Sequence, residues 1–256
     1  MMQLTSAIKL GIAARRDVLE RQLRSLYVQQ IAARPADEYI KRHALPEFAA
    51  GSVAVFRWYE RFLPQSGTIL DWGCRHAPDS CLLRMEHGEQ YELHGCDVES
   101  SDAFLPFHRF ANLKYRALEN IVRIPYPDQM FDAVIATGVL EHAARDYDSL
   151  RELHRILKPD GRLIISYLPN RLSLSEWWVR HIKKSGFHQR LYRLGEARNM
   201  LLHSGFEPLE WGYQSRLDLL NRIQPVFPPL RIAARLLGLR HFTSGLCLAA
   251  RRVQGF

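Results

Sequence analysis

A chain of 256 residues with 47% hydrophobic and 24% charged residues has enough apolar material for one sizeable core, and this composition excludes an intrinsically disordered protein. The formal charge of +8 is uneven, because residues 43–170 carry 13 basic against 18 acidic side chains and the flanks supply the basic excess. Basic flanks suit an anionic substrate or an anionic membrane surface, although solvated arginine-rich helices would give the same pattern.

The cysteines Cys74, Cys81, Cys96 and Cys247 form no CxxC pair, which is typical of reduced thiols in the cytoplasm. Basic residues follow the apolar start of the chain rather than precede it, so we expect no signal peptide. No uncharged apolar run approaches the ~20 residues that a membrane span needs. We therefore expect a cytoplasmic protein whose membrane contact, if it has any, is peripheral, and we expect no metal site.

The first 66 residues are predicted to be a helical arm and cap. Apolar residues recur at near-helical spacing from Ile8 to Leu26, and Pro35 follows this amphipathic stretch. A second helix is expected from Gly51 to Phe62, which is rich in aromatic residues. These segments would cover the core or the site.

A buried strand and a turn follow at residues 68–78. Thr68, Ile69 and Leu70 suit a strand buried on both faces, Asp71 marks its end, and Gly73 allows a sharp turn before a helix that begins near Asp79. In open α/β sheets, ligands bind at this carboxyl edge of the strands.

The next strand, Tyr91 to Asp97, completes a βαβ unit and also ends in an acid. Asp97 would therefore lie at the same sheet edge, where a carboxylate can accept hydrogen bonds from both hydroxyls of a ribose. A solvated loop aspartate is the alternative interpretation.

Strands and helices continue to alternate across the central region. Strands are expected at 113–118, 133–136 and 162–168, and a helix at 148–157 is ended by Lys158-Pro159-Asp160-Gly161. This alternation predicts an α/β fold with a doubly wound, parallel sheet.

Residues 131–170, FDAVIATGVLEHAARDYDSLRELHRILKPDGRLIISYLPN, resemble the post-binding half of class I S-adenosylmethionine-dependent methyltransferases, particularly the small-molecule branch. Together with TILDWGC at residues 68–74, the resemblance covers residues 67–170. It implies a Rossmann-like sheet of seven strands, mostly parallel, whose last pair is an antiparallel hairpin formed here by 207–214 and 245–253. The methyltransferase domain would then span 67–256.

The resemblance also implies S-adenosylmethionine as the cofactor, and it assigns positions to its parts. The cofactor-binding residues that it implies are Asp71, Gly73 and Cys74 at the methionine portion, Asp97 at the ribose, Glu119 and Asn120 at the adenine edge, and Thr137, Gly138 and Val139 beside the sulfonium.

Arg75 and Ala77 stand where the family's donor turn places glycines. Glycine adopts positive φ without steric cost, whereas other residues do so only with strain. A turn that follows a slightly different path and a turn that has lost donor binding are both compatible with this sequence.

Two histidines are candidate catalytic residues. If the acceptor is a hydroxyl, it must lose a proton, and a histidine near the donor methyl group is the usual base. His142 belongs to the Glu-His pair of the family pattern, and His188 lies in the segment that covers the acceptor pocket in related folds. A packing or capping role for His142, and a structural or exposed position for His188, are the alternatives.

Residues 171–192 are predicted to be a lid on the acceptor side, because Leu172, Trp177 and Trp178 give an apolar, aromatic surface beside Arg180 and Lys183. Residues 216–240 are expected to be a helical insertion, packed on the hairpin or lying on a membrane surface.

These features predict a methyltransferase that acts on a small-molecule or lipid-like acceptor, at oxygen. One alternative is a non-catalytic, methyltransferase-like binding or regulatory protein with a degenerate donor loop. Another is an enzyme that modifies a glycan or lipid precursor at a membrane face. Nucleic acid is not expected as a partner, because no RNA-binding signature accompanies the interleaved aromatic and basic residues. The sequence does not predict an oligomeric state.

Overall fold

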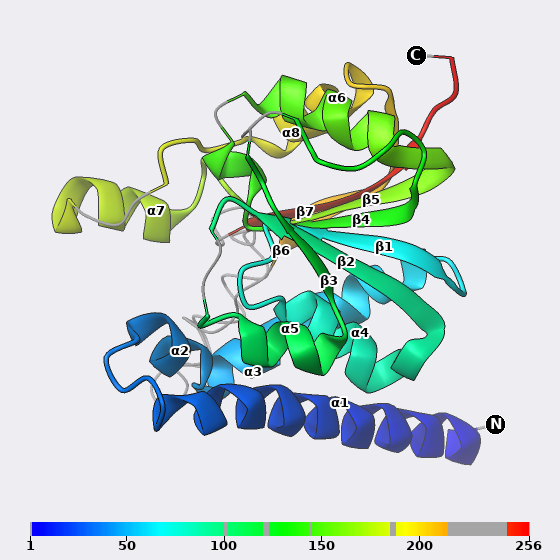
Figure 1. Ribbon diagram of the computed structural model, residues 1–256. Coiled ribbons are helices and arrows are strands. Elements are labelled where there is room, and N and C mark those ends of the chain that lie inside the picture. Colours follow the sequence, from blue (N-terminus) through cyan, green and yellow to red (C-terminus); the bar gives the residue numbers. More distant parts are fainter. Residues whose placement is uncertain are drawn as a thin grey trace.

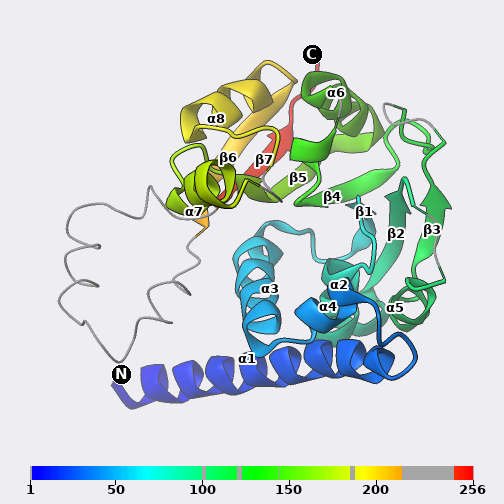
Figure 2. The ribbon, with the colours of Figure 1, turned by 90° about the vertical axis from the view of Figure 1, so that its left-hand side faces the viewer.

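The computed structural model describes residues 2–99, 102–119, 123–143, 145–184, 188–214 and 245–255. A seven-stranded sheet crosses the middle of the molecule, with helices on both faces (Figures 1 and 2). Its strands are β1 (Gly67–Trp72), β2 (Tyr91–Asp97), β3 (Lys114–Ala117), β4 (Phe131–Thr137), β5 (Leu157–Pro169), β6 (Phe206–Gln214) and β7 (Gly245–Arg252).

The strand order is β3-β2-β1-β4-β5-β7-β6. The first five strands in this order, β3, β2, β1, β4 and β5, pair in parallel, and β7 pairs antiparallel with both β5 and β6. This topology confirms the predicted Rossmann-like sheet, mostly parallel with an antiparallel hairpin at its C-terminal end. Because the order reverses between β1 and β4, the carboxyl ends of these two strands flank the switch point, where α/β sheets bind ligands.

Two layers of helices cover the sheet. One face carries α1 (Met2–Ile31), α3 (Pro46–Tyr59), α4 (Pro78–His87) and α5 (Leu105–Ala111), and the other carries α6 (Asp146–Ile156) and α8 (Leu194–Leu202) (Figure 1). The short helices α2 (Glu38–His43) and α7 (Leu174–Trp178) lie beyond the carboxyl edge, and α7 projects from the body of the protein (Figures 1 and 2).

Alternation along β1 shows why this strand is buried on both faces. Leu70 and Trp72 pack with α6 and α8, whereas Ile69 packs with the N-terminal helices through Leu23 and Phe56. Burial of each such side chain contributes about 1.5–3 kcal/mol. The N-terminal helices thus share one hydrophobic core with the sheet.

Four details differ from the sequence prediction. Helices α2 and α5 were not anticipated, and α3 begins at Pro46 rather than Gly51 because proline suits the first turn of a helix. Strand β5 already begins at Leu157, because Leu157 pairs with Phe131 across a register shift. Lys158 to Gly161 therefore lie within the strand instead of forming only a helix stop.

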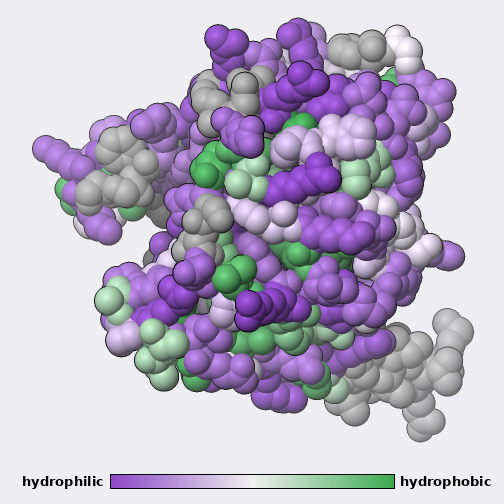
Figure 3. Space-filling model, viewed as in Figure 1, coloured by the Kyte–Doolittle hydropathy of each residue, from purple (hydrophilic) through white to green (hydrophobic). Residues whose placement is uncertain are grey.

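The predicted insertion at 216–240 lies outside the described residues. In the part of the chain that the structure describes, no helix is both long and apolar enough to cross a membrane. Polar side chains cover most of the face in Figure 3, with hydrophobic side chains confined to small patches.

Candidate functional site

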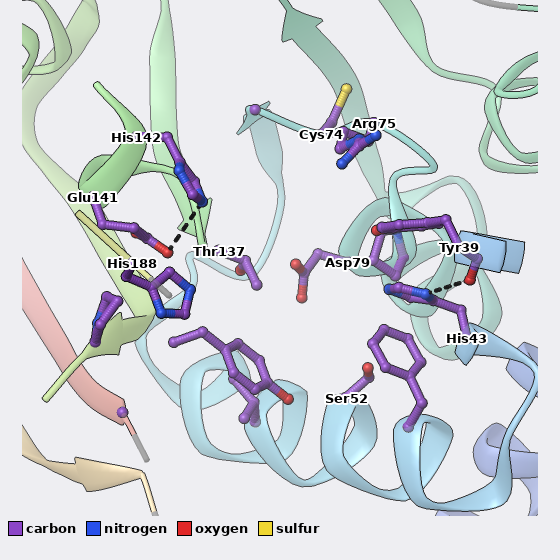
Figure 4. Close-up of a pocket in the computed structure, with 18 of the residues that line it drawn as sticks. Tyr39, His43, Ser52, Cys74, Arg75, Asp79, Thr137, Glu141, His142 and His188 are labelled. Carbon is purple, nitrogen blue, oxygen red and sulfur yellow. Dashed lines mark hydrogen bonds and ion pairs between the residues drawn. The ribbon is translucent and has the colours of Figure 1, made fainter. Parts of the chain in front are cut away.

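A cavity of about 500 Å³ opens at the carboxyl edge of the sheet, which is the size of a small-molecule site. Three groups of residues line it (Figure 4). They include Tyr39, Arg42 and His43 of α2 with Phe48, Ser52 and Val55 of α3, then Asp71, Gly73, Cys74 and Arg75 at the end of β1 and in the turn after it, and Thr137, Gly138, Glu141, His142, Glu176 and His188 on the side of β4 and α7.

The turn after β1 keeps its left-handed backbone despite its side chains. Gly73, Arg75 and Ala77 have φ of 70°, 44° and 48°. The Gly73 N–H donates to the Cys96 carbonyl over 2.8 Å, and a Cβ on Gly73 would lie 2.3 Å from Val139 Cγ2. Left-handed backbone at a residue with a side chain costs about 1–2 kcal/mol. The turn therefore retains the conformation that glycines would allow and tolerates the strain.

Two aspartates lie buried beneath this turn. The hydroxyl and N–H of Ser80 donate to Asp71 Oδ2 over 2.7 and 3.3 Å, and the hydroxyl of Tyr59 donates to Asp79 Oδ1 over 2.7 Å. Burial, together with the charge of Asp79, raises the pKa of Asp71, and burial raises the pKa of Asp79. The negative charge of Asp79 disfavours ionisation of Asp71.

Asp97 ends β2 beside the turn, at the position predicted for ribose binding. It is 7% exposed, and its two carboxylate oxygens accept hydrogen bonds from the N–H groups of Arg75 (3.1 Å) and Glu99 (3.3 Å). The carboxylate therefore ties the turn to the end of β2. It lies beside the cavity rather than in its lining.

The remaining predicted cofactor residues divide into two groups. Thr137 and Gly138 line the cavity, and the Thr137 hydroxyl is hydrogen-bonded to that of Ser166 over 2.9 Å. Val139 contacts Gly73 but, among the described residues, is not part of the lining. Glu119 is exposed and away from the cavity, and Asn120 lies outside the described residues.

The sequence interpretation missed a stack of rings that covers the donor turn. The Tyr39 ring lies between those of His43 and His76, with centroids 3.6 and 4.6 Å away, and the Arg75 guanidinium lies 4.8 Å from the Tyr39 centroid. Burial lowers the pKa of His76 to about 4 and that of His43 to about 3. Tyr39 and His43 lie ahead of β1 and His76 lies after it, so no single segment of the sequence signals the stack.

The group of residues on the side of β4 and α7 contains two carboxylates and two histidines. His188 Nδ1–H donates to Glu176 Oε1 over 2.8 Å, and His142 Nε2 lies 3.9 Å from Glu141 Oε1. The centroids of the His142 and His188 rings are 5.9 Å apart. The two histidines predicted separately, 46 positions apart in sequence, thus face the same cavity (Figure 4).

Each member of this group has a shifted pKa. Burial raises the pKa of Glu141 to about 7, and the hydrogen bond to Glu176 raises that of His188. Burial and the neighbouring His188 lower the pKa of His142. Shifted pKa values in a cavity are typical of functional groups. Glu141 and Glu176 were not predicted, although Glu141 belongs to the Glu-His pair in the sequence.

Comparisons with known proteins agree with this architecture. A family model described as a methyltransferase domain matches residues 70–165. A probable S-adenosylmethionine-dependent methyltransferase of Mycolicibacterium smegmatis is 32% identical over 88 residues, covering 34% of this chain and 33% of the relative. A demethylmenaquinone methyltransferase of Symbiobacterium thermophilum is 26% identical over 118 residues, 42% of this chain and 47% of the relative. The matched segments thus span a third to a half of these curated relatives.

Solved structures share the fold across most of the chain. A geranyl diphosphate C-methyltransferase from Streptomyces coelicolor, in complex with Mg²⁺, geranyl diphosphate and S-adenosylhomocysteine, has a TM-score of 0.59. It is 16% identical, and the match covers 86% of this chain and 84% of that one. A 1,6-didemethyltoxoflavin-N1-methyltransferase from Burkholderia thailandensis has a TM-score of 0.56 and 17% identity, over 91% and 88% of the two chains.

The match to residues 70–165 contains the donor turn and the ends of β1, β2 and β4. These are the elements that build one wall of the cavity and its rim. S-adenosylmethionine is the cofactor of the family, and the retained left-handed turn fits it. Residues 70–165 are therefore a methyltransferase domain of the class I S-adenosylmethionine-dependent family.

Proposed function

We propose that the protein is a methyltransferase that transfers a methyl group from S-adenosylmethionine to oxygen of a small-molecule or lipid-like acceptor. One observation carries this proposal: a single cavity joins the donor turn at Gly73–Arg75 to the group formed by Glu141, His142, Glu176 and His188. A donor held at the turn and an acceptor beside the histidines would share one enclosed space. Holding two reactants in this way provides most of the catalysis in a methyl transfer.

The chain's own residues would hold the cofactor at three places. The backbone of the turn and the buried Asp71 would face the methionine portion, Asp97 the ribose, and Thr137 with Gly138 the sulfonium. Bound there, S-adenosylmethionine supplies a methyl group that is electrophilic because its leaving group is a neutral thioether. The left-handed φ at Arg75 and Ala77 favours this proposal over a non-catalytic protein, because the turn keeps the path that the missing glycines would have given it.

Methylation at oxygen is supported by the polar group on the acceptor side. An acceptor hydroxyl must lose its proton as it attacks the methyl carbon. Two histidines and two carboxylates in one cavity can promote that loss, either as bases or as ligands of a cation. A neutral amine attacks through its own lone pair and would have less need for such a cluster.

A lipid-like acceptor is supported by the two faces of the segment 174–184. Glu176 and Val179 line the cavity, whereas Trp177 and Trp178 are 53% and 57% exposed. Arg180, Lys183 and Lys184 follow on the same projecting segment. Exposed tryptophans beside basic residues are typical of surfaces that lie on anionic membranes. The segment would then bring the cavity mouth to the lipid from which the acceptor comes.

Calorimetric titration with S-adenosylmethionine and S-adenosylhomocysteine tests the donor half of this proposal. We expect micromolar affinity for the purified protein and a loss of at least tenfold in Asp97→Ala. Asp102→Ala, which removes an exposed aspartate five positions further on, is the matched control and should bind like the wild type. No detectable binding by the wild type would favour the non-catalytic alternative.

Co-sedimentation with vesicles that contain anionic lipid tests the acceptor half. The wild type should bind in a salt-sensitive manner, and the double variant Trp177→Ala with Trp178→Ala should bind less while retaining donor affinity. Trp211→Ala, at an exposed tryptophan on β6, is the control. Equal loss of donor affinity in the double variant, or no salt-sensitive binding by the wild type, would contradict the proposal.

A further inference from the structure

We propose that Glu141, His142 and His188 bind a divalent transition-metal ion in the acceptor half of the cavity. This inference deepens the proposed function and rests on it for what the ion does, although ion binding itself does not depend on a donor. Each of the three residues offers one ligand atom, and these atoms all lie within 4.8 Å of one another. Figure 4 shows the three side chains gathered on one side of the cavity.

The spacing of the ligand atoms is close to what one ion requires. Nitrogen and oxygen ligands bind Zn²⁺ at about 2.0–2.2 Å, so two ligand atoms on one ion are at most about 4.4 Å apart. The pair His142 Nε2 and Glu141 Oε1, at 3.9 Å, already meets this limit. Small side-chain rotations would bring the third atom within it.

An independent observation is the carboxylate of Glu141 itself. The residue is only 5% exposed, and its Oε2 accepts no hydrogen bond from any residue that the structure describes. A buried carboxylate oxygen without a partner is costly, and the usual remedies are a hydrogen-bond donor, a proton or a metal ion. An ion bound between Glu141 and the two imidazoles would supply the missing partner.

Glu176 holds the ring of His188 through a hydrogen bond on the side away from the proposed ion. It accepts the Nδ1–H of His188 over 2.8 Å, and from this hydrogen bond we assign the proton to Nδ1. The Nε2 lone pair of His188 is thereby left for an ion. Histidine ligands of metal ions almost always donate their other N–H to a carboxylate or carbonyl, which fixes the ring and makes it a better ligand.

The ligand set indicates which kind of ion would bind. Two imidazoles and one carboxylate suit Zn²⁺, Mn²⁺ or Fe²⁺, whereas Mg²⁺ and Ca²⁺ prefer oxygen ligands only. Three protein ligands leave at least one position open, as in catalytic rather than structural sites. Because the three residues line the cavity, that position would be available to the acceptor.

An acceptor hydroxyl bound at the open position would ionise at a lower pH, since a divalent ion stabilises the oxygen anion, and its proton would pass to water. The imidazoles of His142 and His188 would then act as ligands rather than as bases. This assignment differs from the general-base role for which the two histidines were candidates, and from the packing, capping or structural roles that were the alternatives.

Equilibrium dialysis of the untagged, chelator-treated protein with Zn²⁺, Mn²⁺ and Mg²⁺ tests the site without donor or acceptor. We expect one Zn²⁺ per chain with micromolar or tighter affinity, and Mg²⁺ at least 100-fold weaker. His188→Ala and His142→Ala should each weaken Zn²⁺ binding at least tenfold. His203→Ala, at an exposed histidine after α8, is the matched control and should bind Zn²⁺ like the wild type.

A loss of Zn²⁺ binding in His142→Ala would not reflect misfolding, because the His142 side chain is largely exposed and its truncation leaves the core intact. Circular dichroism and thermal unfolding of each variant check that. Less than one Zn²⁺ per chain in the wild type, or unchanged affinity in both folded histidine variants, would overturn the proposal. Since no S-adenosylmethionine is present, failure here is distinct from failure of the donor titration.

Discussion

The two sides of the cavity are built differently. The donor side, from Asp71 to Ala77, is mostly buried, with Arg75 exposed, and its turn is fixed by hydrogen bonds to the backbone of β2 and to the Asp97 carboxylate. The acceptor side is formed by the ends of β4 and β5 and by the projecting segment 174–184, whose large apolar side chains are exposed.

Under the proposed function, the donor would be held by backbone conformation and strand ends, which the core fixes. The acceptor meets side chains on a peripheral segment, which can change at little cost to the core. Substitutions on the donor side should therefore change the stability of the fold, and those on the acceptor side mainly binding.

The largest effect is expected for Gly73→Ala. Its φ of 70° is unfavourable for alanine, and the added Cβ would lie 2.3 Å from Val139 Cγ2, so we expect a loss of about 3 kcal/mol or more in unfolding free energy, with loss of donor binding. Gly88→Ala is the control, because Gly88 also has positive φ but no neighbour within 4 Å. It should cost about 1–3 kcal/mol, because its φ of 58° and ψ of −133° are strained for alanine, and leave donor affinity unchanged. Equal losses in denaturant titrations of the two variants would contradict the crowding argument.

The second-largest effect is expected from acid, which should lower the unfolding free energy through protonation of His76. The pKa of His76 is lowered to about 4 by burial, whereas in the unfolded chain it is about 6.5. Between these pH values only the unfolded state binds the proton. The contribution of His76 to the unfolding free energy is therefore fully present above pH 6.5 and is lost as the pH falls towards 4. At pH 5 the loss from this residue is about 2 kcal/mol.

Denaturant titrations at pH 7.5 and pH 5 test this expectation with His76→Phe. The variant should lose about 2 kcal/mol less than the wild type between the two pH values. His203→Phe, at an exposed histidine, should keep the dependence of the wild type. If His76→Phe keeps it as well, the buried ring is not the source of acid sensitivity.

A smaller effect on stability is expected at Arg75, where two variants distinguish the contribution of the backbone conformation from that of the side chain. Arg75→Ala and Arg75→Gly remove the same guanidinium, but only glycine relieves the strain of φ 44°. Part of that gain is offset by the greater entropy of glycine in the unfolded chain, so the glycine variant should be more stable by about 0.5–1 kcal/mol. Chemical denaturation of the pair measures this difference, and an alanine variant at least as stable as the glycine variant would show that the turn is not strained there.

Much of the fold could be predicted because its signals are local. Continuous apolar runs such as Ala133–Ala136 predicted buried parallel strands, and the acids at Asp71 and Asp97 marked the ends of β1 and β2. Helices α2 and α5 were missed because they are short and their signals are weak. Leu157 was assigned to the helix and Lys158–Gly161 to its stop, because the pairing of Leu157 with Phe131 is not visible in a single segment.

The candidate site was predictable to the extent that it lies in motifs. Gly73 and Thr137, which the resemblance assigned to the donor, line the cavity, and Arg75 and Ala77 keep the left-handed backbone that glycines would allow. The stacking of Tyr39 between His43 and His76 was not predictable, because it joins segments that only the packing of α2 on the turn brings together.

The sequence by itself determined the alternation of strands and helices in the central region and the sheet edge that carries the site, because hydrophobic periodicity and turn residues are local along the chain. The motifs at residues 68–74 and 131–170 carried the resemblance to the family. Only the tertiary structure decided that Glu141, His142 and His188 converge with Glu176 behind them. Their distances depend on how η3 (Leu140–His142) and the segment after α7 pack across the cavity, and no local pattern encodes that packing.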